Sequence, residues 1–343
     1  MTRRVAAVDC GTNSLRLLVA DVDPDRARVT DVARRMEIVR LGQGVDSTGR
    51  LAPEALIRTT GVLADYAAVI AASGAHAIRM VATSATRDAA NAEEFTRRVT
   101  EVLGVAPEVL TGTEEARLSF TGATAELAAE ADGDLFLVAD IGGGSTEFVL
   151  GMAVPPRGHD AGPGGRPPGI PRARGGSPPP RTPLTPLAAS VNIGCVRMTE
   201  RHLHGDPPTP GQIAAATADI DAALDSVSGT VPVREARTLI GLAGSVTTVA
   251  GIAMGLPAYD AARIHHARVS AADVHQVTRS LLAQTRAARA AIGVMHPGRV
   301  DVIGGGALVL DRIMGRFGFT EVLVSEHDIL DGIAWSLADD ARG

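Results

Sequence analysis

Short apolar runs alternate with longer amphipathic stretches along the first third of the chain. Val5–Val8 and Leu15–Val22 flank residues 9–14, which are of types that tolerate tight turns, so this segment predicts a β-hairpin. Expected next are a β-rich run near Asp31–Leu41, helices at Pro53–Ala72, Ala89–Gly104 and Glu114–Ala129, and strands at Ala77–Val81 and Val105–Leu110. Three strands followed by alternating helices and strands predict an α/β layer fold with a mixed sheet.

The second half of the chain opens on a copy of that hairpin. Leu135–Ala139 and Thr146–Leu150 are apolar runs on either side of a turn at residues 140–145. When the two turns are aligned, Asp140 falls on Asp9, Gly142 on Gly11 and Ser145 on Ser14, each 131 residues further along. We interpret this repeat as a duplication that produces two related domains facing each other.

A segment rich in proline and glycine follows the second hairpin. Of the 32 residues from Pro155 to Pro186, 18 are proline or glycine and five are arginine. Such a composition buries too little apolar surface to offset its ordering entropy, so we expect a disordered loop inserted between two strands. The elements expected after it are strands at Ala188–Ile193, Thr238–Leu242, Val300–Ile303 and Val322–Val324, and helices at Val196–Leu203, Pro210–Ser226, Ala271–Ile292, Ala307–Phe317 and Ile329–Ala341.

The composition is that of a soluble globular protein, with 343 residues, 45% of them hydrophobic and 21% charged. All 33 basic residues are arginine, which excludes a P-loop because that motif needs a lysine. The net charge of −6 argues against nucleic acid as a partner. Cys10 and Cys195 form no ligand-spaced cluster, and no uncharged apolar run reaches spanning length. We therefore expect a cytoplasmic protein without a membrane or nucleic-acid partner.

Four glycine-rich turns each follow an apolar run. Backbone N–H groups of such turns bind phosphate because no Cβ blocks the approach. Any one of them alone is more simply a structural turn, but four at strand ends would gather at one edge and suit a long polyanion. The four turns are Gly11–Ser14, Gly142–Ser145, Gly241–Ser245 and Gly304–Gly306.

Four carboxylates near these turns are candidates for metal binding and catalysis. Asp9 and Asp140 each end a strand with glycine two residues on, where a carboxylate can hold Mg²⁺ through water or, alternatively, cap an Asx-turn. Hydrolysis of a phosphoanhydride also needs an oriented water and a base. Glu115 at the start of a helix and Glu147 directly after the second turn could serve, although an acidic first helical turn and an exposed strand residue are the simpler readings.

Five motifs occur in order along the chain: Asp9–Ser14, Thr83–Ala89, Gly112–Arg117, Asp140–Glu147 and Asn192–Arg197. Together they resemble the exopolyphosphatase/guanosine pentaphosphate phosphatase family. The resemblance runs from Val5 to about Leu337. That family belongs to the superfamily of actin, sugar kinases and heat-shock ATPases, which implies two duplicated ribonuclease-H-like domains with mixed sheets, flanking helices and a cleft between them.

The resemblance also implies roles for individual residues. Glu115 matches the base proposed for the attacking water, Glu147 a second functional glutamate, and Asp140 a position linked to magnesium and catalysis. Asp9 is a less certain metal ligand. The resemblance implies Mg²⁺ as the cofactor, with Mn²⁺ as an alternative. The phosphate-binding positions are Asn13, Ser14, Arg87, Gly142, Gly143, Gly144, Ser145, Gly244 and Ser245.

The domain organisation expected is the short, two-domain form of that family. Residues 1–114 with about 328–343 would form domain I, and residues 115–327 domain II, with the inserted loop at 155–186. The chain stops where longer members continue into a helical domain with metal-binding His and Asp. His265 and His266 are merely adjacent, and such pairs are more often structural than metal ligands. A homodimer agrees with the resemblance, but no sequence feature demonstrates it.

The activity expected is release of terminal orthophosphate from inorganic polyphosphate, with a preference for shorter chains. Alternatives on the same fold are hydrolysis of guanosine pentaphosphate, the nucleotide of the stringent response, and a non-catalytic sensor of either ligand. A sugar or acetate kinase would need an acceptor in place of water, against which the Glu115 motif argues. A haloacid-dehalogenase-type nucleophile at Asp21 or Asp23 is disfavoured by the turn-like Asp23-Pro24-Asp25 context.

Overall fold

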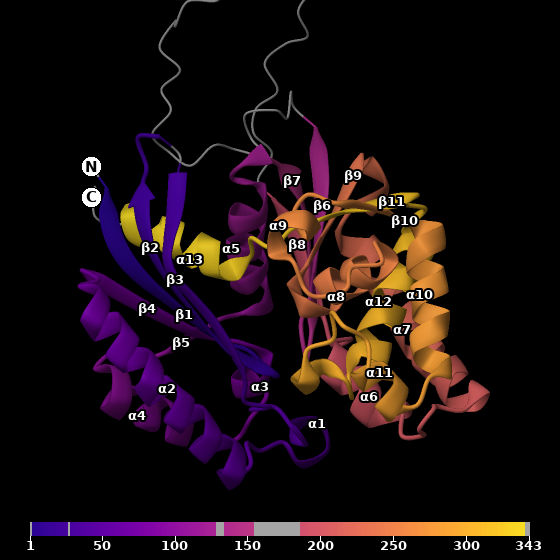
Figure 1. Ribbon diagram of the computed structural model, residues 1–343, viewed down its shortest axis with the longest axis horizontal. Helices are drawn as coiled ribbons and strands as arrows, with labels where there is room; N and C mark the ends of the chain where they lie inside the picture. Colours follow the sequence, from indigo (N-terminus) through magenta and orange to yellow (C-terminus); the bar gives the residue numbers. More distant parts are fainter. Residues whose placement is uncertain (1, 27, 128–133, 154–185, 340–343) are drawn as a thin grey trace, which may run out of the picture.

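Two β-sheets form the centre of the protein, seen in a computed structural model that describes residues 2–26, 28–127, 134–153 and 186–339 (Figure 1). The first sheet has five strands in the order β3-β2-β1-β4-β5, with β1 antiparallel to β2 and parallel to β4. The hairpin expected at the N-terminus is therefore confirmed. These strands are β1 (Arg3–Cys10), β2 (Ser14–Asp23), β3 (Arg28–Ile38), β4 (Ala77–Ala82) and β5 (Glu108–Val109).

The second sheet repeats the first and adds one strand. Its order is β10-β11-β9-β6-β7-β8, and β6 is antiparallel to β7 and parallel to β9, as β1 is to β2 and β4. The shared order and directions confirm the duplicated, mixed-sheet fold predicted from the two matching turns. These strands are β6 (Leu135–Ile141), β7 (Thr146–Met152), β8 (Leu187–Val191), β9 (Thr238–Leu242), β10 (Arg268–Ser270) and β11 (Glu321–Val324).

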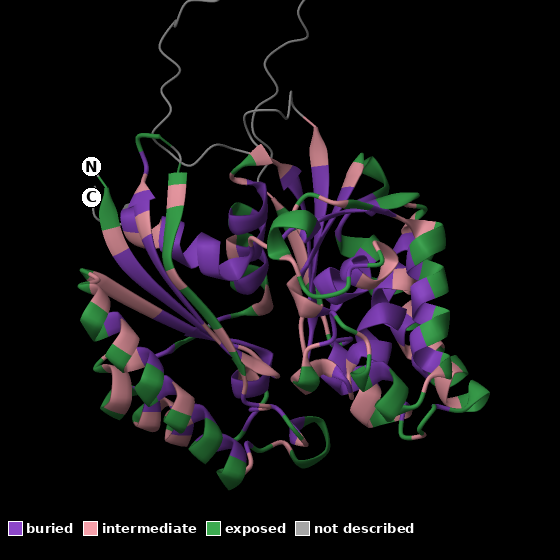
Figure 2. Ribbon diagram, viewed as in Figure 1, coloured by how far each residue is buried: buried purple, intermediate pink, exposed green. Residues whose placement is uncertain are grey.

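Helices cover the outer faces of both sheets and bury their apolar stripes there (Figure 2). On the first sheet these are α2 (Pro53–Ser73) and α4 (Ala92–Leu103), beside the short α1 (Val45–Thr48) and α3 (Ser84–Arg87). By length and composition α2 could cross a membrane, but it packs on β2 and α4. The helices around the second sheet are α6 (Cys195–His202), α7 (Pro210–Thr230), α8 (Ala243–Ala253), α9 (Ala261–Ile264), α10 (Ala271–Ala283), α11 (Arg286–Ala290) and α12 (Ile303–Phe317).

Two helices lie between the sheets, where the chain crosses from one to the other (Figure 1). The crossing helix α5 (Gly112–Thr124) packs on β6, β7 and β8, whereas α13 (Ile329–Asp339) packs on β1 and β2. The two helices also pack on each other, so α13 returns the C-terminal part of the chain to the first sheet. The boundaries expected at 114/115 and 327/328 stay a prediction.

Two of the expected elements differ from the structure, and the structure leaves a third expectation untested. Val300–Ile303 is not a strand, because its first three residues continue the turn at Pro297–Arg299 and Ile303 begins α12. The helix expected over Ala271–Ile292 is two helices, because Thr285 caps a new one, α11, with its hydroxyl. Apart from Pro186, the loop expected to be disordered lies outside the described residues.

The turn Gly304–Gly306 is also wrong as a phosphate loop. These glycines lie inside α12, and a Cβ on Gly306 would meet the Ser245 hydroxyl at 2.2 Å. Close packing between α12 and α8 therefore explains the need for glycine at position 306 better than anion binding does.

Candidate active site

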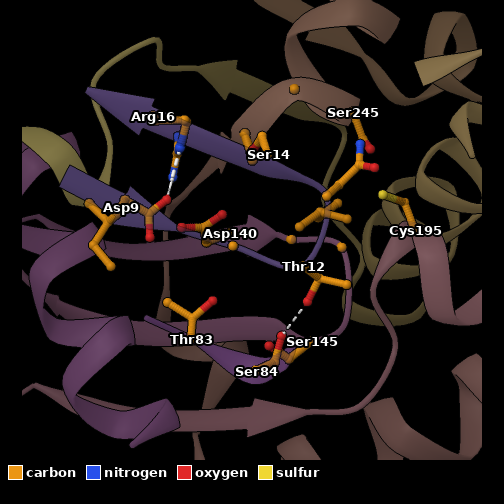
Figure 3. Close-up of a pocket in the computed structure, with 18 of the residues that line it drawn as sticks. Asp9, Thr12, Ser14, Arg16, Thr83, Ser84, Asp140, Ser145, Cys195 and Ser245 are labelled. Atoms are coloured by element: carbon orange, nitrogen blue, oxygen red, sulfur yellow. Dashed lines mark hydrogen bonds and ion pairs between the residues drawn. The ribbon is translucent and has the colours of Figure 1, made fainter. Parts of the chain in front are cut away.

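A cleft lies between the two sheets, lined by the turn of the first hairpin and the turn of the second (Figure 3). Its wall combines the ends of β1 and β6 with the N-termini of α5 and α8. Segments more than a hundred residues apart in sequence therefore line one site. Of the residues expected at the site, the structure places ten in this wall: Asp9, Asn13, Ser14, Glu115, Asp140, Gly142, Gly143, Ser145, Gly244 and Ser245.

Three expected residues lie just behind the wall. Gly144 faces the turn of the other hairpin, where a Cβ would meet the hydroxyls of Ser84 and Thr12 at 2.6 and 2.8 Å. Arg87 at the end of α3 donates to a carboxylate oxygen of Glu115 at 3.2 Å. Glu147 is fully buried. These three residues can support the site from behind the cleft surface.

The two hairpins place opposite charges at equivalent positions. Asp9 is the cross-strand partner of Arg16 in the first hairpin, and Asp140 is the cross-strand partner of Glu147 in the second. Arg16 and Glu147 are themselves 131 residues apart, which is the offset of the duplication. Side chains directly opposite on neighbouring strands interact, so Asp9 faces a cation and Asp140 an acid.

Arg16 neutralises much of the charge around Asp9. Its guanidinium donates to one Asp9 oxygen at 2.9 and 2.7 Å and also pairs with Asp328. Burial raises the pKa of Asp9, and Arg16 opposes that rise. The other oxygen of Asp9, Oδ1, is buried and has no hydrogen-bond partner among the described residues. A buried carboxylate oxygen without a partner is costly, so a ligand at this position would stabilise the site.

Asp140 and Glu147 have much less compensation. The Ser119 hydroxyl donates to Asp140 at 2.7 Å, but burial first and Asp328 second raise the pKa of Asp140 to about 6. Glu147 accepts from the Ser190 hydroxyl at 2.7 Å, and burial first and Asp140 second raise the pKa of Glu147 to about 7. Both carboxyl groups therefore bind a proton more readily than an exposed acid does.

The N-terminus of α5 turns one glutamate outward and the next one inward. Glu114 is exposed and closes a capping box with Thr111, whose backbone N–H it accepts at 2.9 Å. Glu115 is 8% exposed and lines the cleft beside Arg87. Burial first and Glu147 second raise the pKa of Glu115 well above its usual range, while Arg87 lowers it. Glu115 is thus a buried carboxylate that reaches the surface of the cleft.

The carboxylates of the cleft fit a divalent cation. Three buried acids, Asp9, Asp140 and Glu115, line the cleft, and Asp328 raises the pKa of both aspartates, while Arg16 and Arg87 oppose only part of these effects. Mg²⁺ takes one or two carboxylates and otherwise water or phosphate oxygens. The partnerless Oδ1 of Asp9 and the oxygen of Asp140 not bonded to Ser119 are suitable donors of this kind.

The turn of the second hairpin is built to bring its backbone close to the first. A Cβ on Gly143 would meet the Thr12 side chain at 2.8 Å, so only glycine allows the two turns to touch. The carbonyl of Gly144 accepts from Arg197 at 2.7 Å, which fixes the turn from behind. The Gly142 N–H of this turn donates to the Asp140 carbonyl at 3.2 Å, whereas Gly143 and Ser145 line the cleft, where backbone N–H groups can face an anion.

A comparison with protein families assigns the chain. Residues 18–341 match the model of the Ppx/GppA phosphatase family. The chain belongs to the Ppx/GppA phosphatase family. It is 47% identical to exopolyphosphatase 2 of Mycobacterium tuberculosis over 98% of each chain. The family resemblance predicted from the sequence motifs is thereby confirmed.

Solved structures of related proteins agree with this assignment. A crystal structure of an exopolyphosphatase-like protein superposes with a TM-score of 0.88 at 42% identity, covering 100% of this chain and 99% of the other. The Aquifex aeolicus member of the Ppx/GppA family gives a TM-score of 0.75 at 25% identity over the full length of both chains. The fold of this chain is thus the fold of the family.

Sequence reasoning missed several residues of this Ppx/GppA cleft. Arg16 could have been found, because a hairpin closed at residues 9–14 sets it opposite Asp9. Arg299 has no such signal, because it ends a tight turn far along the chain. It lines the cleft and donates to the Thr248 hydroxyl at 3.3 Å. Asp328 becomes visible only through its pairing with Arg16.

Proposed function

We propose that this chain is an exopolyphosphatase that releases orthophosphate from the end of inorganic polyphosphate. The observation that carries the proposal is the position of Glu115, a buried carboxylate in the wall of the cleft that the two glycine-rich turns also line. The name of the similar M. tuberculosis protein and the family assignment support it. A base beside a phosphate cradle is the arrangement that attack by water requires.

The residues divide the work of hydrolysis among them. Backbone N–H groups of Gly142–Ser145, with Asn13 and Ser14 opposite, hold the terminal phosphate. Glu115 accepts a proton from a water molecule, whose oxygen forms a bond to the terminal phosphorus. The bond from that phosphorus to the bridging oxygen breaks, and the shortened chain leaves with the bridging oxygen. Arg87 donates to Glu115 and partly opposes the rise of its pKa, which favours the ionised form that acts as the base.

A divalent cation would be held by Asp140 together with Asp9. Mg²⁺, or Mn²⁺ in its place, supplies charge neutralisation for the phosphate oxygens when bound. The acid-rich cleft would otherwise repel a polyanion, because Asp9, Asp140 and Glu115 all line it. Asp9 shapes the cleft from the first sheet, and Glu147 holds the second hairpin from behind. A preference for short chains, a cytoplasmic location and a homodimer stay predictions.

Phosphate release from a panel of substrates tests this function. The protein is incubated with Mg²⁺ and polyphosphates of defined length, guanosine pentaphosphate, or ATP with and without a sugar or acetate acceptor. We expect orthophosphate from polyphosphate and none after chelation of the metal. Release from guanosine pentaphosphate alone would move the assignment to that substrate. Binding of polyphosphate without release would favour a sensor, and acceptor-dependent loss of ATP would favour a kinase.

A further inference from the structure

Two histidines and a glutamate from three separate segments meet beside the loop that joins β11 to α13. Glu126 follows α5, His265 follows α9, and His327 lies in the loop itself. The Nε2 atom of His265 lies 3.2 Å from Oε2 of Glu126, and Nδ1 of His327 lies 3.6 Å from the same oxygen. We propose that these three side chains form a binding site for a divalent transition-metal cation of the Zn²⁺ class.

The spacing of the three side chains suits a tetrahedral ion. With metal–ligand distances of about 2.0–2.2 Å, neighbouring ligand atoms of a tetrahedral site lie about 3.3 Å apart. The two measured separations are close to that value, and one ligand atom from each residue can lie within 4.8 Å of both others. Three protein ligands leave the fourth position to water or another molecule.

The ligand chemistry separates this site from the cleft. Imidazole nitrogens suit zinc, copper and nickel, whereas magnesium prefers oxygen ligands. The cleft offers the carboxylates of Asp9 and Asp140, and this cluster offers two imidazoles and one carboxylate. Each site therefore selects a different class of cation. A hydrogen bond from His265 lowers the pKa of Glu126, which keeps that carboxylate ionised and ready to bind a cation.

Sequence reasoning treated His265 and His266 as a structural pair. The structure stacks their rings at 3.8 Å between centroids, but the partner that makes a site is His327, whose ring lies 4.6 Å from that of His265. These two residues are 62 positions apart, so spacing along the chain could not reveal them.

Ion binding at this cluster requires one hydrogen bond to change. The backbone N–H of Glu326 donates to Nδ1 of His265 at 3.2 Å, so without metal the ring proton is on Nε2 and faces Glu126. A cation displaces that proton, and a neutral ring bound through Nε2 carries its proton on Nδ1 instead. The Glu326 N–H then loses its acceptor. Binding therefore also alters the loop two residues before Asp328, which pairs with Arg16 in the cleft.

Equilibrium dialysis of the full chain against Zn²⁺, with Mg²⁺ in excess to fill the oxygen site, tests the proposal. We expect one Zn²⁺ per chain for the unchanged protein and at least a ten-fold weaker affinity for Glu126→Gln and for His327→Gln. The control is His202→Gln, because His202 pairs with Asp219 at 2.9 Å without joining a metal-type cluster in the described part of the chain. This control should bind Zn²⁺ like the unchanged protein.

Two further measurements distinguish loss of the metal site from misfolding of a variant. Zn²⁺ should raise the melting temperature of the unchanged protein and of His202→Gln but not of Glu126→Gln, whose substitution lies at an exposed position. Co²⁺ in place of Zn²⁺ should give the intense visible absorption of a tetrahedral site. Failure of the unchanged protein to bind Zn²⁺, or an equal loss in His202→Gln, would overturn the proposal.

Discussion

At the scale of single residues, the two copies of the hairpin differ in one charge: the first has Arg16 where the second has Glu147. Asp9 faces Arg16, and Asp140 faces Glu147 at the equivalent position. A cation lowers the pKa of a neighbouring acid, whereas burial next to another acid raises it. The first hairpin therefore holds a carboxylate paired with a cation, whereas in the second hairpin burial and Asp328 raise the pKa of Asp140 to about 6, and a bound metal ion would favour its charged form.

Arg87 sets the pH at which Glu115 can accept a proton. Arg87 lowers a pKa that burial and Glu147 raise, so Arg87→Gln should raise the pKa of Glu115 further. A base works only when it is ionised, and activity therefore rises with pH through that pKa. We expect the acidic limb of the kcat/KM profile to move to higher pH in Arg87→Gln.

Arg79→Gln is the matched control for this pH profile. Arg79 in β4 pairs with Glu108 in β5 at 2.8 Å, and neither residue lines the cleft. The acidic limb of the kcat/KM profile of Arg79→Gln should lie at the same pH as that of the wild-type enzyme. An Arg87→Gln enzyme that is slower at every pH, with an unmoved limb, would show that Arg87 does not act through the pKa of Glu115.

The sequence allowed prediction of the site residues that lie at turns, but not of the side chains that surround them. The sequence motifs led to Asp9, Asp140 and Glu115, because glycine-rich turns and helix starts have local signals. The contact of Arg299 with the cleft depends on tertiary packing and has no local signal. The location of Arg87 and Glu147 behind the wall likewise depends on which way each side chain turns.

At the scale of elements, the contact between α5 and α13 depends on glycine. A Cβ on Gly332 of α13 would meet the carbonyl oxygen of Leu118 at 2.0 Å, and one on Gly122 of α5 would meet that of Asp328 at 1.8 Å. Both distances are far below a normal contact, so the two helices can approach this closely only through glycine. Since α5 carries Glu115 and Asp328 precedes α13, this contact also positions the site.

Gly332→Ala should therefore destabilise the protein, by about 1–3 kcal/mol or more, as overpacking does. Gly315→Ala is the control, because Gly315 is an exposed glycine in α12 with open space around its Cβ position. That change should stabilise the helix by about 0.5–1 kcal/mol. Denaturant unfolding measures both. Equal effects of the two substitutions would contradict the packing role assigned to Gly332.

Most elements were predictable from periodicity, and the errors have physical causes. Val300–Ile303 was expected as a strand, but its first three residues form a turn and only Ile303 belongs to α12, whose first two turns are buried. The break between α10 and α11 depends on the Thr285 cap, which a continuous helical pattern conceals. The short β10 pairs with β11 over three residues, which is too few for a sequence pattern to detect.

At the scale of the whole molecule, Arg197 connects the two halves of the cleft. It belongs to α6 beside the second sheet, and it holds the Gly144 carbonyl while pairing with Asp46 and Asp88 from the first half. The Arg197 side chain is 10% exposed, and those of Asp46 and Asp88 are 20% and 32% exposed. Loss of both partners would leave a mostly buried guanidinium without a compensating charge. The network should therefore hold the two glycine-rich turns against each other.

Asp46→Asn combined with Asp88→Asn should loosen that connection. We expect a larger radius of gyration in small-angle scattering without substrate and a kcat/KM lower by about ten-fold or more, since misplaced groups lose catalysis steeply. The matched control is Asp221→Asn, which removes one partner of an Asp221–Arg312 pair on the second sheet side alone. A double variant as compact and as active as the control would refute the connection.

The duplicated fold was predictable, because the two hairpins repeat one sequence pattern. The contacts that join the two halves of the molecule were not predictable. Packing of α13 on the first sheet and the Arg197 network join segments distant in sequence, and neither has a local signature.

The comparison of Glu115→Gln with Glu114→Gln tests the central claim most directly. The two residues are neighbours of one type, but Glu115 lines the cleft and Glu114 is an exposed capping residue. With Mg²⁺ and saturating polyphosphate, orthophosphate release should fall by about a hundred- to ten-thousand-fold in Glu115→Gln. Glu114→Gln should remain close to the unchanged enzyme. Undiminished release by a folded Glu115→Gln variant would contradict the account.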